Sequence, residues 1–162
     1  MFPFDFRTIY FTYIVINVVN LVLIVSLYYQ IRKRFPGTFL IVLSFLLSAA
    51  GNIMIFLRDY IPDWISIITG NLLTIVSIHL LIIGFEKFVN KTSSQFKNII
   101  VITVFFLVHC YFTYSDPDLN ARILNSSFAY LFLSFEISYL MLKKAPLSMI
   151  KITRSVGYAF VS

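Results

Sequence analysis

The chain has 162 residues, of which 59% are hydrophobic and 12% are charged, and its formal net charge is +6. A soluble globular domain carries about 25% charged residues, so this composition excludes a water-soluble domain and predicts an integral membrane protein. The basic residues stand in short clusters between apolar runs, and no soluble stretch is long enough for a basic patch, so we expect no nucleic-acid partner.

Uncharged apolar segments recur along the chain, and in lipid such a segment must satisfy its own backbone hydrogen bonds as a helix. Between Asp63 and Glu86, for example, lie 22 residues without a carboxylate, Lys or Arg, a length of about 33 Å as a helix. The predicted fold is a single all-α transmembrane bundle with spans at about 9–30, 38–57, 64–86, 98–114 and 123–142. From residue 155 another apolar run begins that is too short to cross a bilayer, so we expect the start of a sixth span and a fragment of a longer protein.

The connections between the spans alternate in charge. Ten of the 13 basic residues fall in 31–37, 86–97 and 143–154, whereas Arg7, Arg58 and Arg122 fall on the other side. The positive-inside rule therefore predicts cytoplasmic placement of the three basic connections and an external N-terminus. We expect a multi-pass protein of the cell inner (plasma) membrane, with the lipid bilayer as its first partner.

Small residues gather in the second span, where Ser44, Ser48, Ala49, Ala50 and Gly51 occur. Small side chains let two helix backbones approach closely, so this segment predicts a packing face and would permit a homodimer. The single cysteine, Cys110, lies in an apolar run and leaves no partner for an intramolecular disulfide.

Two histidines, His79 and His109, lie within predicted spans. Intramembrane histidines can ligate haem or a transition metal, and these two are weak haem candidates. Because there is no second histidine pair and no HxxxH spacing, interhelical hydrogen bonding is the alternative that we favour. We expect no metal site and no cofactor.

Glu136 is an ionisable residue inside the fifth predicted span, at about the same depth as His79. Such a residue is costly in lipid and by default suggests a function. Glu136 and His79 could share a proton and form a switch between two helix packings. The alternative is a protonated glutamic acid that only stabilises the bundle.

Further polar residues are candidates for a ligand site. Asn52 and Asn71 lie in the outer thirds of the second and third spans, and a stripe along the fifth recurs every four residues: Ser126, Tyr130, Ser134 and Ser138. Such groups act as interhelical hydrogen-bonding contacts or line a cavity for a small ligand. No phosphate loop, HExxH, GxSxG or CxxC motif occurs, so we expect no catalytic residues and no enzymatic activity in this chain.

The order of several soft motifs suggests a family. Arg32-Lys-Arg-Phe-Pro-Gly37 is followed by a span ending in Arg58, then Tyr60-Ile-Pro-Asp-Trp64, Gly70-Asn71 and Gly84-Phe-Glu-Lys-Phe88. Over about residues 28–92 this order resembles the multi-span N-terminal sensor region of bacterial diguanylate cyclases (GGDEF proteins) and of sensor histidine kinases. The resemblance implies six to eight spans that feed a cytoplasmic output domain, which this chain does not contain.

Three functions follow as hypotheses. The favoured one is a membrane sensory or signal-input module, in which a small ligand or a protonation event shifts a bundle between two packings. The ligand-site and proton-switch candidates are Glu136, His79, Asn52, Asn71, Tyr130 and Ser134. The alternatives are a small transporter or channel and, less favoured, a haem-binding membrane protein.

Overall fold

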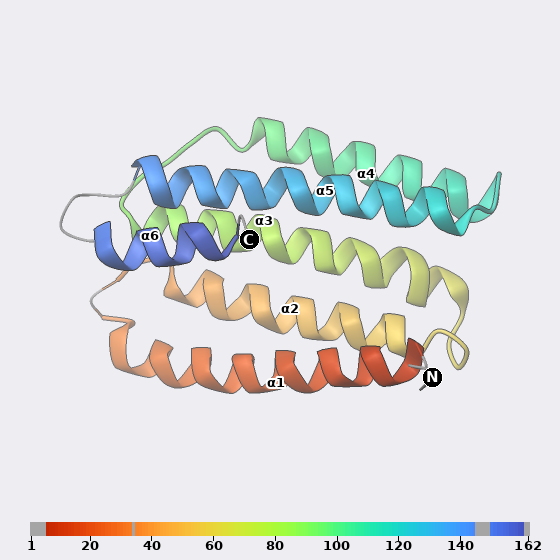
Figure 1. The fold of residues 1–162 in the computed structure, drawn as a ribbon, viewed down its shortest axis with the longest axis horizontal. Helices are drawn as coiled ribbons and strands as arrows, with labels where there is room; N and C mark the ends of the chain where they lie inside the picture. Colours follow the sequence, from red (N-terminus) through yellow and green to blue (C-terminus); the bar gives the residue numbers. More distant parts are fainter. Residues whose placement is uncertain (1–5, 34, 145–149, 161–162) are drawn as a thin grey trace.

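The computed structural model describes residues 6–33, 35–144 and 150–160 and shows a bundle of helices with no strand among them (Figure 1). The elements are α1 (Phe6–Ile31), α2 (Thr38–Phe56), the π-helix η1 (Trp64–Thr69), α3 (Gly70–Phe88), α4 (Phe96–Tyr114), α5 (Leu119–Tyr139), the π-helix η2 (Leu140–Lys144) and α6 (Ile150–Ala159). Five helices are long and apolar enough to cross a membrane. The prediction of an all-α polytopic bundle is thereby confirmed.

The helices pack in the order α1, α2, α3, α5, α4, and α6 packs on η2 and α5 (Figure 1). The connections 32–37 and 89–95 lie at one end of the bundle, on the left of Figure 1, which we call the basic end. The connections 57–63 and 115–118 lie at the other, and we call it the aspartate end because it holds Asp59, Asp63, Asp116 and Asp118. The basic and the acidic connections, from which the orientation is predicted, therefore lie at opposite ends of the bundle.

Glycines bring α2 and α3 into close contact along their whole length. A Cβ atom added to Gly51 would lie 2.7 Å from the carbonyl oxygen of Gly70, and one added to Gly84 would lie 2.8 Å from Cγ1 of Ile41. The small-residue face of α2, with Ser44, Ala49 and Gly51 buried, thus packs inside the chain. The predicted packing face exists, and α3 covers its buried residues Ser44, Ala49 and Gly51.

The helix that begins at Leu119 starts four residues earlier than expected. The Asp118 carboxylate accepts hydrogen bonds from the backbone N–H groups of Asn120 (2.8 Å) and Ala121 (3.2 Å). An aspartate in this position satisfies the free donors of a helix start. Arg122, which the sequence pattern places in a turn, consequently lies in the first turn of α5.

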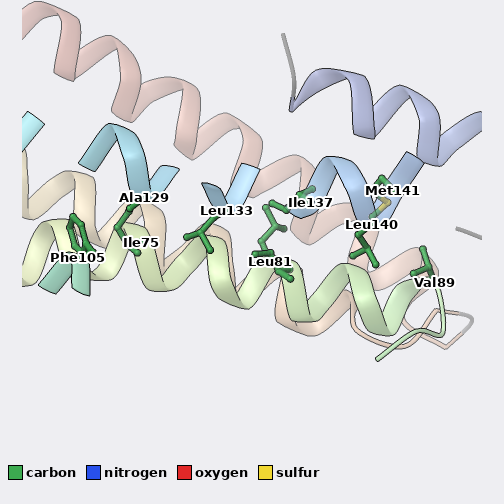
Figure 2. Close-up of a cluster of buried hydrophobic side chains, with 10 residues drawn as sticks. Ile75, Leu81, Val89, Phe105, Ala129, Leu133, Ile137, Leu140 and Met141 are labelled. Carbon is green, nitrogen blue, oxygen red and sulfur yellow. The ribbon is translucent and has the colours of Figure 1, made fainter. Parts of the chain in front are cut away.

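A dry core joins α3, α5 and η2 in the half of the bundle nearer the basic end (Figure 2). Leu81, Leu133, Ile137, Leu140 and Met141 belong to this core, and Leu133 and Ile137 have no exposed surface. From the aspartate-end side, Ile75 and Phe105 continue the same cluster. Apolar side chains therefore pack α3 against α5 from the middle of the bundle to the basic end.

Polar side chains hold the connection between α3 and α4 at the basic end. The Glu86 carboxylate, buried at 4% exposure, accepts hydrogen bonds from Ser93 Oγ and from Gln95 Nε2, the latter at 2.7 Å. Glu86 therefore holds the connection between α3 and α4 in place. The sixth helix begins at Ile150, five residues before the predicted start. Directly after its end, the Phe160 ring lies 6.4 Å from that of Phe85 on α3.

Candidate functional site

A cavity of about 670 Å³ opens among the helices at the aspartate end. Its polar wall consists of Tyr13, Asn52, Arg58, Ser66, Asn71, His109, Arg122, Ser126, Ser127 and Tyr130, and its apolar wall of Ile55, Ile67, Leu119 and Ile123. All five membrane-spanning segments contribute to it. The volume falls within the range of about 300–1,000 Å³ that is typical of small-molecule sites.

The π-helix η1 shapes one side of this cavity. Thr69 Oγ1 donates to the Trp64 carbonyl five residues earlier (3.2 Å), and the Gly70 N–H bonds to the Ile65 carbonyl across the same interval. The wider turn carries Ser66 and Ile67 at the cavity wall, both buried. Short π-helical segments are frequent at functional sites, and the sequence predicts only a regular helix here because no residue pattern marks such a turn.

His109 of α4 is a deeply buried polar residue of the wall. It is 3% exposed, and neither of its ring nitrogens has a hydrogen-bond partner. Its ring packs at 5.1 Å from that of Phe105, near the backbone of Ile67. Since a neutral imidazole has one donor and one acceptor, and the Ile67 backbone lies beside one ring nitrogen, His109 can offer the other to a ligand in the cavity.

Two arginines give the cavity its charge. Arg122 has a buried Nε without a partner, and it lies within electrostatic range of Arg58, Asp63 and Asp118. Neither aspartate belongs to the wall, and Asp118 already caps α5 through its Oδ1. The wall therefore contains two guanidinium groups and no carboxylate.

A chain of hydrogen bonds beside the cavity joins α5 to α3. The Tyr130 hydroxyl donates to Thr74 Oγ1 (2.8 Å), and that hydroxyl donates to the Asn71 carbonyl (2.8 Å). The Asn71 side chain in turn donates to the Ile67 carbonyl in η1 (2.6 Å). The wall of the cavity is thus tied to both helices that also form the dry core.

The two predicted asparagines line the cavity, but the bonds that their amides donate stay within their own helical segments. Asn52 Nδ2 donates to the Ser48 carbonyl at 2.8 Å, four residues earlier, and Asn71 Nδ2 makes the equivalent bond to Ile67. The structure therefore does not show the interhelical hydrogen bonds that were one of the two expectations for these amides. The other expectation placed Asn52 and Asn71 in a cavity with the hydroxyls of the fifth span, and their positions agree with it.

Glu136, His79 and Ser134 lie outside the cavity wall. Within the described residues no hydrogen bond or ion pair joins Glu136 to His79, and Glu136 Oε2 and His79 Nδ1 are both without partners. The proposed pairing is not formed in this structure.

The structure also separates the two haem candidates. His109 lines the cavity, whereas His79 is half-buried on α3 away from it. In the described ranges no group of three or more His, Cys, Asp or Glu side chains could hold a metal ion. The polar wall residues that sequence reasoning missed are Tyr13, Arg58, Ser66, Arg122 and Ser127. Arg122 nevertheless shares with Ser126 and Tyr130 the spacing of four that marks one helix face.

No protein-family model, curated protein or solved structure matches this chain. The class must therefore be read from the fold and the cavity alone. They define a multi-pass α-helical membrane protein with a polar, arginine-containing cavity at one end of its bundle.

Proposed function

We propose that this chain is the membrane-embedded signal-input module of a bacterial sensor in the inner membrane, and that it binds a small ligand at the aspartate end. The cavity carries the proposal, because it combines the volume of a ligand site with a buried His109 whose ring nitrogens are both unpartnered. By the positive-inside rule this end faces outward, where a stimulus would arrive.

Helix α5 supplies the route by which binding would reach the cytoplasmic side. It carries Arg122, Ser126 and Tyr130 at the cavity, and it continues through η2 to Lys144 at the basic end. A ligand that binds one packing of α5 better than another would shift the population toward that packing. A cytoplasmic output domain of the cyclase or kinase type would then respond to the position of the η2 segment.

Transport has less support as an alternative. A transporter needs a path from the binding site to the other side of the membrane, usually beside broken helices near the midplane. Here Leu133 and Ile137 of α5 are fully buried between the cavity and the basic end. The second pocket, of about 430 Å³, lies between α4 and α5 and has an almost wholly apolar lining in which only Asn125 is polar.

The proposal is tested by a ligand screen on the full chain in nanodiscs. Anionic, cationic and neutral small amphiphiles are added, and thermal unfolding is followed for the native protein, for Ser126→Leu and for Ser134→Leu. Both serines are half-buried on α5, but only Ser126 lines the cavity. We expect stabilisation by at least one class of compound that is lost in Ser126→Leu and kept in Ser134→Leu.

The signalling part is tested with spin labels on cysteines introduced at Lys33 and Lys143 in a Cys110→Ser background. Both lysines are exposed near the basic end. We expect a stabilising compound to change the distance distribution between the labels. If no compound class stabilises the protein, or if a bound compound leaves this distribution unchanged, the input-module function is refuted.

A further inference from the structure

We propose that the ligand of the cavity is a small amphipathic anion, with a carboxylate or phosphate head and one elongated apolar body. The inference rests on the proposed function, and it adds the chemical class of the ligand.

The charge of the wall selects the head group. Arg58 and Arg122 line the cavity without a carboxylate among the lining residues, and Arg122 Nε is buried and unpartnered. Asp63 and Asp118 lie within electrostatic range of Arg122, but neither lines the cavity. An arginine near the membrane interface is costly to bury unless it is paired or hydrogen-bonded. The planar guanidinium presents a fork of N–H donors that matches the oxygens of a carboxylate or phosphate.

His109 of α4 adds a donor to the same cavity and lies within electrostatic range of Arg122. It lies five residues before the end of α4 at Tyr114, so it is about 7.5 Å inside that end at 1.5 Å per residue. Arg122 lies in the first turn of α5, which runs antiparallel to α4. The three cationic or donor side chains therefore stand at the outer part of the cavity, at the level of a membrane interface.

The remaining wall selects the body of the ligand. The cavity reaches along α5 from Leu119 to Tyr130, a length of about 16 Å for 11 residues of helix. Ile55, Ile67 and Ile123 line it between the polar groups. A long, narrow apolar group fits this space with its charged head at the arginines.

Two sources could supply this chemistry: a free amphiphile from the outer aqueous phase, or an anionic lipid from the bilayer. The test uses Trp64, the single tryptophan of the chain, which is two residues from Ser66 in the cavity wall. Full-length protein in phosphatidylcholine nanodiscs is titrated with 2-bromoundecanoate, whose bromine lies next to the carboxylate and therefore near Trp64, where it quenches tryptophan fluorescence. The neutral alcohol and the cationic trimethylammonium compound with the same chain length and the same bromine serve as charge controls.

We expect saturable quenching by the carboxylate, with an affinity at least tenfold above that of either control. Loss of a charge-assisted hydrogen bond should weaken binding of the carboxylate by about 10-fold to 100-fold in Arg122→Gln and in Arg58→Gln. Arg154→Gln, at an exposed arginine of α6, is the matched control and should bind as the native protein does. Circular dichroism verifies that each variant is folded. If Arg122→Gln fails to fold, Arg58→Gln and the comparison of the carboxylate, the alcohol and the cation test the proposal.

Repeating the titration in nanodiscs that contain phosphatidylglycerol distinguishes the sources. A weaker apparent affinity for bromoundecanoate would support the anion class and assign the bilayer as the source, whereas an unchanged affinity would support an aqueous ligand. Equal or tighter binding of the alcohol or the cation would overturn the anion proposal and leave the input-module function standing. That function fails separately, when no compound class stabilises the protein in the screen above.

Discussion

The two ends of the α3–α5 pair are built from the same two helices but have opposite interiors. Toward the basic end, Leu133 and Ile137 of α5 are fully buried in a dry core (Figure 2). Toward the aspartate end, Tyr130 lines a cavity of about 670 Å³ and bonds to Thr74 beside it. Lipid tails are as apolar as leucine, so close packing and not the avoidance of water holds the dry half together. The cavity half has less packing and more polar groups, which suits binding and rearrangement.

The largest expected effect comes from truncation within the dry half. Leu133→Ala should lower the free energy of unfolding by about 2–5 kcal/mol, because a fully buried side chain leaves a cavity behind. Leu119→Ala is the matched control on the same helix, since Leu119 lines the cavity and is 54% exposed. Steric-trapping unfolding in bicelles measures both, and equal losses would contradict the contrast between the two ends.

Close packing of α2 on α3 predicts the next effect. Gly51→Ala should cost about 1–3 kcal/mol, because the new Cβ would stand 2.7 Å from the Gly70 carbonyl oxygen and push the helices apart. Gly84→Ala, with a Cβ 2.8 Å from Ile41 Cγ1, should cost a similar amount. Only Gly51 lies beside cavity-wall residues of α2 such as Asn52, so only Gly51→Ala should also alter binding of bromoundecanoate. An equal binding loss in both variants would show that the cavity is not independent of the basic end.

A smaller effect is expected at the start of α5. Asp118→Ala removes the side-chain cap and should cost about 1 kcal/mol. Because the first turn then frays, the amides of Asn120 and Ala121 should exchange hydrogen faster. Asp116→Ala, two residues earlier and outside the cap, serves as control for the lost charge. Unchanged exchange in Asp118→Ala would mean that packing alone holds Arg122 at the cavity.

The smallest effect is predicted for the hydrogen bond between the two helices at the cavity. Tyr130→Phe removes the donor to Thr74 and should cost about 0.6 kcal/mol, the average found for such bonds within membranes. Tyr111→Phe, at a residue that is 53% exposed, is the control and should leave stability unchanged. A loss above 2 kcal/mol would place the polar end on a par with the dry core and remove the distinction between them.

The membrane-spanning bundle could be predicted from the sequence because apolar length and charge clusters depend on composition along the chain. Asn52, Asn71 and Tyr130 could also be singled out, since buried polar groups stand out in apolar segments. Which way a side chain turns about its helix depends on packing, so the expected contact of Glu136 with His79 was not found. The sequence pattern places Arg122 in a turn, because the charge at Arg122 marks a span boundary more strongly than the cap at Asp118 marks a helix start; the cap lengthens α5 to include Arg122.

The glycine contacts between α2 and α3 also bear on the order in which the protein assembles. These two helices follow each other in the chain and are joined by a connection of a few residues. Helices α2 and α3 can therefore pack against each other while the ribosome is still producing α4 and α5, before the dry core has formed. His109 and Arg122 arrive with those later helices. We expect the cavity to form after the α2–α3 pair during synthesis, and ligand binding to report that α4 and α5 have joined that pair.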